Sequence, residues 1–178
     1  MPNGKLLPFH GQDGNIPAWF LKKDPEARVD AVEAGWITDQ RVLAEIARTD
    51  QELYVRRAAV ERLTDEAALF SITRTEGIGY IRAAAAEGIT NQAMLETILQ
   101  TDMSWIVRKA AIHNLTDQAL LEKLATTDPH EYVRGEAAFR LTDLTALKRI
   151  AEVDVHESVR DMAKRRIEEL EEQPLNRR

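Results

Sequence analysis

Histidine is the residue type in this sequence best suited to proton transfer or metal binding, and the chain has four of them. His130 and His156 occupy the same position in successive copies of an internal repeat, whereas His10 and His113 have no counterpart of this kind. If the first two lie on neighbouring helices, about 8–10 Å apart, they need further ligands to hold a metal ion. The sequence has no cysteine and no nucleophile elbow, phosphate loop or zinc-protease helix. We therefore expect no catalytic residue, no metal site and no cofactor.

Arginine recurs at one position of the same repeat, which could build a stripe that binds phosphate groups. The five arginines at this position are Arg56, Arg82, Arg108, Arg134 and Arg160. An arginine on one of two packed helices also reaches an acid at the start of its neighbour. The spacing is therefore compatible with a ligand stripe and with an internal ladder of ion pairs.

The elements that carry these residues form an internal repeat with a period of about 26 residues. Five copies align without a gap: Ile37–Arg62, Leu63–Gly88, Ile89–Asn114, Leu115–Arg140 and Leu141–Arg166. A degenerate copy precedes them from near Gly11, with Phe20, Asp24 and Val29 in phase with Ile46, Asp50 and Val55. We expect one domain over residues 1–178, with an N-terminal segment (1–10), six repeats (11–166) and a cap and tail (167–178).

Each repeat carries two helix signals. The first helix begins with a threonine followed by Asp or Asn, as in Thr38-Asp39, which is typical of an N-cap with an acid in the first turn. The second begins at an acid, and the segments Asp128–Glu131 and Asp154–Glu157 have the pattern of capping boxes. Its apolar positions, four residues apart, give one buried face. Helices of about 10 and 12 residues are too short to be stable alone, so the sequence predicts an all-α fold, an α-solenoid of about six stacked helix pairs.

The second helix of each repeat carries a recognisable run, in which an acid is followed five residues later by Val-Arg or Ile-Arg, as from Asp50 to Arg56. This run resembles the core signature of HEAT and HEAT-like repeats, over roughly residues 16–167. The unit is shorter than the roughly 40 to 47 residues of HEAT repeats, and the short bilin-lyase type is the nearer comparison. The resemblance implies a ladder in which the recurring arginines pair with acids of the neighbouring repeat. In the first repeat Asp30 replaces the arginine, so we expect that repeat to cap the stack.

Function is expected where the repeat varies, because stacking explains the residues that recur. One strip of the second helix, here called the variable strip, lies outside the apolar and arginine positions, and the resemblance places it on the concave surface. In the five regular repeats its residues are Leu53, Arg57 and Glu61; Gly79, Ala83 and Glu87; Trp105, Lys109 and His113; Glu131, Gly135 and Phe139; and Glu157, Asp161 and Arg165. Trp105, Lys109 and His113 follow each other on it at intervals of four residues, beside small residues of neighbouring repeats. A large aromatic side chain beside small residues is a common anchor for a partner, although Trp105 could instead lie flat and fill that space. The residues predicted to bind a protein or peptide are Trp105, Lys109, His113, Phe139, Leu53 and Arg57.

Three tyrosines share one repeat position at the border of the apolar face: Tyr54, Tyr80 and Tyr132. We expect their rings to pack against the core, with the hydroxyl groups reaching water or the groove.

Composition limits the classes of partner. The net charge of −6 and the mixed charges of the variable strip argue against nucleic acid. No apolar run approaches the roughly 18 residues of a membrane span, and the N-terminus lacks the pattern of a signal peptide, so we expect no membrane association and a cytoplasmic location.

The sequence thus predicts a noncatalytic scaffold that binds a protein or peptide on its concave face. The alternative is a HEAT-like lyase or accessory subunit acting on a bound chromophore or other ligand, with Trp105, His113 and the tyrosines around a pocket. A DNA glycosylase of the HEAT-like class would need a basic groove, which the variable strip lacks.

Overall fold

The structure is a computed structural model, and it describes residues 15–172. Within these residues the chain is all-α, with twelve α-helices and no strand. The predicted all-α fold is confirmed. The predicted N-terminal segment (1–10) and the last six residues of the predicted tail lie outside the described residues. The chain divides into two compact units after Ile89.

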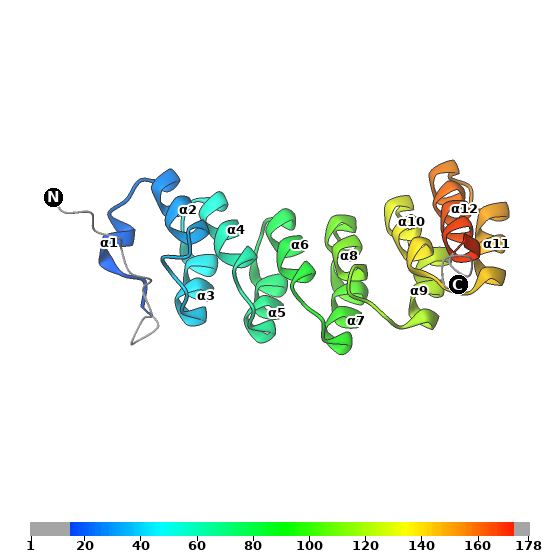
Figure 1. The fold of residues 1–178 in the computed structure, drawn as a ribbon. Coiled ribbons are helices and arrows are strands. Elements are labelled where there is room, and N and C mark those ends of the chain that lie inside the picture. Colours follow the sequence, from blue (N-terminus) through cyan, green and yellow to red (C-terminus); the bar gives the residue numbers. More distant parts are fainter. Residues whose placement is uncertain (1–14, 173–178) are drawn as a thin grey trace. The chain divides into compact units, whose positions relative to one another are not determined.

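The first unit contains α1 to α6 (Figure 1). Their bounds are α1 Ala18–Leu21, α2 Pro25–Glu33, α3 Gln40–Thr49, α4 Leu53–Glu61, α5 Glu66–Thr75 and α6 Gly79–Glu87. Helices α3 and α4 form one pair and α5 and α6 another, and α4 also packs against α2 and α6.

The second unit contains α7 to α12. Their bounds are α7 Gln92–Thr101, α8 Trp105–Ile112, α9 Gln118–Thr127, α10 Glu131–Arg140, α11 Leu144–Val153 and α12 Glu157–Glu172. Helix α10 contacts α8, α9 and α12, so the second helices of successive pairs pack side by side.

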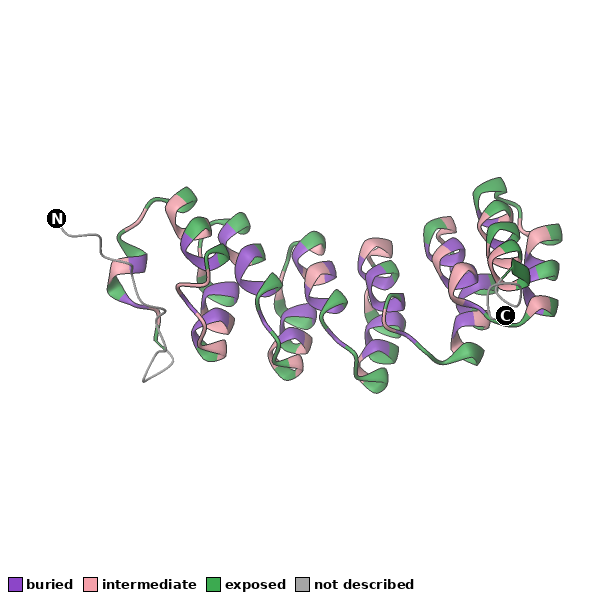
Figure 2. Cartoon of the chain, viewed as in Figure 1, coloured by how far each residue is buried: buried purple, intermediate pink, exposed green. Residues whose placement is uncertain are grey.

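The period predicted from the sequence is the period of the helices. The first helices of the pairs begin at residues 40, 66, 92, 118 and 144, and the second at 53, 79, 105, 131 and 157, always at the same interval. The predicted apolar faces are buried where the helices of a pair meet (Figure 2), as at Leu43, Ile46, Val55 and Ala59. Each large side chain so buried contributes about 1.5–3 kcal/mol, which these short helices need in order to form.

The first helix of each pair is capped one residue later than predicted. The N-cap is the Asp or Asn, not the threonine, and Asp117 Oδ1 accepts the amides of Ala119 and Leu120 at 2.9 and 3.1 Å. Thr64, Thr116 and Thr142 instead donate to a glutamine of the preceding repeat. Both the amide and the hydroxyl of Thr116 donate to Gln92 Oε1, at 2.9 and 3.0 Å. The glutamines recurring at 40, 92 and 118 were the sequence signal for this link.

The acids before the second helices do not form the predicted capping boxes. Asp128 ends α9 as its C-cap, and its Oδ1 accepts the amide of His130 at 2.9 Å. The N-cap of α10 is His130, whose Nδ1 accepts the amide of Tyr132 at 3.3 Å. The carboxylate of Asp128 is turned to the loop and to an arginine of the preceding repeat, so it is not available to cap the helix.

The predicted register of the first repeat is wrong by two residues. The predicted register puts Asp30 at the arginine position, but it is Arg28 that pairs with Asp50, at 2.9 Å. Arg28 follows its N-cap Asp24 by four residues, as Arg56 follows Glu52, so the two arginines are equivalent and the step between them is two residues longer than the regular one. The chain accommodates the longer step in the turn after α2, where Gly35 has a φ of +73° that favours glycine.

Candidate functional site

Arginines of the second helices form ion pairs that hold successive repeats together. In the described part of each unit, an arginine of a second helix pairs with the acid that ends the first helix of the next pair: Arg28–Asp50, Arg56–Glu76, Arg108–Asp128 and Arg134–Asp154, at 2.9, 2.9, 2.8 and 2.8 Å. Arg108 also donates to the carbonyl oxygens of Asp102 and Met103, at 3.1 and 3.0 Å. Because these guanidinium groups are largely buried and already hydrogen-bonded, the predicted ladder is confirmed for Arg56, Arg108 and Arg134, and a ligand stripe is not supported. Arg28–Asp50 extends the ladder into the first repeat, where no arginine was predicted.

Asp154 is a carboxylate of the ladder whose pKa is lowered in the folded chain. Hydrogen bonds from the Arg134 guanidinium hold the pKa of Asp154 below its ordinary value, against the opposing effect of burial. A lowered pKa in the folded state stabilises the fold above the unfolded pKa of about 3.9, and this stabilisation is lost as the pH falls through the folded pKa.

We therefore expect the free energy of unfolding of Asp154→Asn to fall less steeply than that of the wild type as the pH drops below about 4. Urea unfolding followed by circular dichroism, from about pH 7 down to about pH 2.5, measures this dependence. Asp161→Asn is the control, because Asp161 lies in an exposed pair with Lys164. Parallel profiles for the wild type and Asp154→Asn in the acid range would contradict the assignment.

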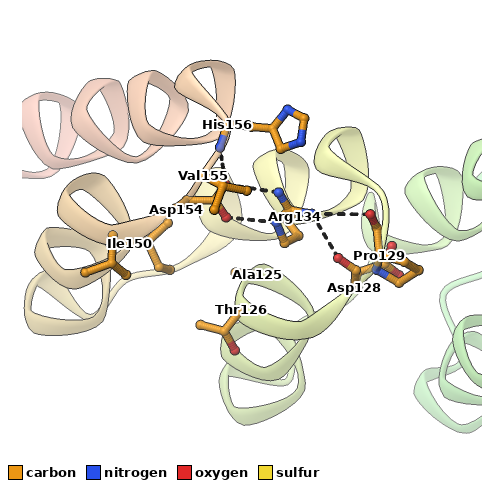
Figure 3. Close-up of a pocket in the computed structure, with 10 residues that line it drawn as sticks. Ala125, Thr126, Asp128, Pro129, Arg134, Ile150, Asp154, Val155 and His156 are labelled. Carbon is orange, nitrogen blue, oxygen red and sulfur yellow. Dashed lines mark hydrogen bonds and ion pairs between the residues drawn. The ribbon is translucent and has the colours of Figure 1, made fainter.

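A notch opens beside the ladder at the loop between the helices of a pair (Figure 3). It has a volume of about 360 Å³ and is lined by Arg134, Asp154, Ile150, Val155 and His156, among others. A notch of about 460 Å³ occurs at the same repeat positions of the first unit, beside Arg56 and Glu76. Its recurrence shows that the notch comes from the geometry of the repeat, and its arginine is already bound to Asp154.

The tyrosine column is not packed against the core. Tyr54, Tyr80 and Tyr132 are 68%, 69% and 51% exposed, so the predicted packing is wrong. Each tyrosine directly precedes a buried Val or Ile of the second helix, as Tyr54 precedes Val55. A step of one residue rotates a side chain by about 100° around the helix, which carries the ring out of the core.

Trp105 lies in an aromatic cluster at the start of the second helices. It is the first residue of α8 and half-buried. Its ring stacks on His130, with centroids 4.4 Å apart and planes at 18°, and lies 5.1 Å from the ring of Tyr132. Trp105 therefore packs on the side chains of His130 and Tyr132 from the next repeat.

The other predicted site residues are divided between the two units. Lys109 lies 3.9 Å from Glu136, and His113 is exposed at the C-cap of α8. Phe139 is half-buried, and the guanidinium groups of Arg165 and Arg166 lie 5.3 and 5.8 Å from its ring centroid. Its ring is therefore engaged within the unit.

Leu53 and Arg57 belong to α4 of the first unit. Leu53 is 40% exposed, and Arg57 pairs with Glu61 at 2.7 Å on the same helix. Trp105 and Lys109 belong to the second unit.

A hollow of about 340 Å³, here called the Gly135 hollow, lies along the variable strip between α10 and α12. It is lined by Lys109, Glu131, Tyr132, Gly135, Glu136, Ser158, Asp161, Met162 and Arg165. Lys109 is the predicted site residue that the structure brings to it directly, and Trp105 adjoins it through Tyr132. The sequence placed Gly135 and Asp161 on the variable strip without naming them as binding residues, and Tyr132 and Met162 were not predicted to bind.

Gly135 is the residue that keeps the hollow open. It lies in the middle of α10, where glycine is less stable than alanine by about 0.5–1 kcal/mol. A Cβ atom built there would come no closer than 3.7 Å to a neighbour, the Cγ of Met162, so packing does not require glycine. The equivalent positions of the other regular repeats hold Arg57, Ala83, Lys109 and Asp161. Gly135 is itself buried, and it contributes no side chain to the lining of the hollow.

Two further classes of site are absent from the described residues. Within residues 15–172 no three His, Asp or Glu side chains are grouped so as to hold a metal ion. None of the helices in that part of the chain has the length and apolar character needed to span a bilayer.

Comparison of the chain with protein-family models, with curated proteins and with solved structures finds no match. Function is therefore inferred from the site itself.

Proposed function

We propose that this protein is a noncatalytic scaffold of the cytoplasm, a HEAT-like α-solenoid that binds a protein or peptide, and that the Gly135 hollow receives a side chain of that partner. The observation that carries the proposal is the glycine in the middle of α10. It lowers the stability of the helix, no neighbour requires it, and it leaves a hollow open beside an exposed aromatic residue.

The lining of the hollow has the character of a protein-binding surface. Tyr132 offers a half-exposed ring that Trp105 supports, and aromatic residues are enriched at the centres of interfaces. Around it Lys109, Asp161 and Arg165 give charges of both signs. A mixed rim favours a partner with a patterned surface over a polyanion.

The alternative of a chromophore-binding lyase has less support. It needs Trp105, His113 and the tyrosines around one pocket. Tyr54 and Tyr80 belong to the first unit, and His113 does not line the hollow. No observation therefore favours this alternative over a binding scaffold.

The test is to fill the hollow. Gly135→Leu should weaken binding at least about ten-fold, equivalent to about 1.4 kcal/mol, because the leucine side chain occupies the space that the partner's side chain would fill. A partner captured from native lysate by the wild type is titrated against each variant by calorimetry.

Gly135→Ala is the matched control. Its Cβ fits beside Met162, so we expect a gain of about 0.5–1 kcal/mol in the free energy of unfolding and a smaller loss of affinity. Full affinity of a folded Gly135→Leu variant would remove the hollow from consideration.

A further inference from the structure

The charges around the Gly135 hollow indicate which side chain it accepts. We infer that the partner inserts an arginine or a lysine, an inference that rests on the proposed function of the same site. The hollow is lined by three acids (Glu131, Glu136 and Asp161) and two bases (Lys109 and Arg165), a net charge of −1.

Both bases of the lining are already engaged. Lys109 Nζ lies 3.9 Å from Glu136, which accounts for one of the three acids. Arg165 lies 3.3 Å from Glu169, outside the hollow, and its guanidinium also lies over the ring of Phe139. The partners of these two bases are therefore Glu136 and Glu169, and neither base forms an ion pair with Glu131 or Asp161.

Glu131 and Asp161 bring this negative charge from the two helices that bound the hollow, α10 and α12. Glu131 lies 3.5 Å from His130 Nδ1. That nitrogen accepts a hydrogen bond from the backbone amide of Tyr132, and a ring nitrogen that accepts a hydrogen bond carries no proton. The imidazole is then neutral. Asp161 pairs with Lys164, yet both side chains are more than half exposed, and an exposed pair of this kind is worth little and exchanges readily.

The rest of the lining suits the stem of a long cationic side chain. Gly135 and Met162 offer apolar contact for its methylene groups, and the ring of Tyr132 offers a face for its charged end. An acidic side chain would meet carboxylates of like charge. A purely apolar one would take those carboxylates out of water without a compensating hydrogen bond.

The experiment uses random twelve-residue peptides displayed on phage, selected on the full chain after counter-selection on Gly135→Leu. We expect the enriched peptides to share an arginine or lysine. For one synthesised peptide, exchange of that residue for leucine should weaken binding at least about ten-fold. Glu131→Gln combined with Asp161→Asn should weaken it at least about five-fold, and added salt should weaken binding to the wild type.

Glu122→Gln is the matched control, because Glu122 is an acid of α9 in an exposed pair with Arg149. It should leave the affinity unchanged. Enriched peptides that need the open hollow but carry no basic residue would overturn the inference and leave the proposed function standing. Peptides that bind the wild type no better than Gly135→Leu would overturn both.

Discussion

Arg108→Ala is expected to lower the free energy of unfolding by about 3 kcal/mol, measured as a shift of the urea midpoint at constant slope. The side chains of Arg108 and Asp128 are only 10% and 4% exposed, and the guanidinium donates two hydrogen bonds to the carboxylate, at 2.8 and 2.9 Å. Removing the arginine leaves a buried carboxylate without its cation and frees the carbonyl oxygens of Asp102 and Met103. A buried charge that loses its partner is among the costliest defects in a folded chain.

The matched control is Arg149→Ala. Arg149 pairs with Glu122 at the shorter distance of 2.6 Å, but these side chains are 57% and 41% exposed. Water already solvates them, so we expect a loss below about 1 kcal/mol.

Arg108→Ala should also lower stability more than it lowers partner affinity. Equal losses for the two variants would contradict the role of burial, and lost binding with unchanged stability would favour the ligand stripe.

The fold was largely predictable because the same local signals recur in each repeat. Burial at Val55 and Ala59 follows from helical spacing alone, and the regular step from one helix pair to the next follows from alignment of the sequence with itself. The first repeat was harder to place. Its alignment matched single residues, such as Asp24 with Asp50, while the chain takes two more residues around Gly35 before the next helix begins.

The caps show where local sequence is ambiguous. Thr116 and Asp117 are both good N-cap residues; Asp117 caps the helix, and the amide and hydroxyl of Thr116 donate to Gln92 of the preceding repeat. Similarly, Asp128 has the sequence context of a cap, but Arg108 of the preceding repeat holds its carboxylate. In both cases the residue takes part in contacts between repeats, and a pattern within one repeat does not contain them.

Of the six residues predicted to bind, Lys109 alone lines the hollow, so the sequence indicated only part of the candidate site. Spacing on a helix placed Trp105, Lys109 and Gly135 on one strip, and the structure places Lys109 and Gly135 around one hollow. Which rings remain free depends on side chains that come from other helices. Arg165 of α12 covers Phe139, while no such neighbour covers the largely exposed Tyr54 and Tyr80 within the described part of the chain.

Trp105→Ala should weaken partner binding by about 2 kcal/mol or more, roughly a thirty-fold loss of affinity. Trp105 does not line the Gly135 hollow itself but stacks on His130 and supports the ring of Tyr132, which does. Without that support the ring of Tyr132 gains freedom that binding must then remove, and the aromatic surface beside the hollow shrinks. The measurement is a calorimetric titration of the captured partner at a temperature where the variant is fully folded.

Lys123→Ala is the control for this titration, because Lys123 is exposed on α9, a first helix of the repeat, and does not line the hollow. Its affinity should equal that of the wild type. Undiminished binding by a folded Trp105→Ala variant, or equal weakening by Lys123→Ala, would show that the aromatic cluster does not belong to the interface. If Trp105→Ala lowers the melting temperature and leaves the affinity unchanged, the stack on His130 serves packing alone, and a partner would have to bind through the hollow without the tryptophan behind it.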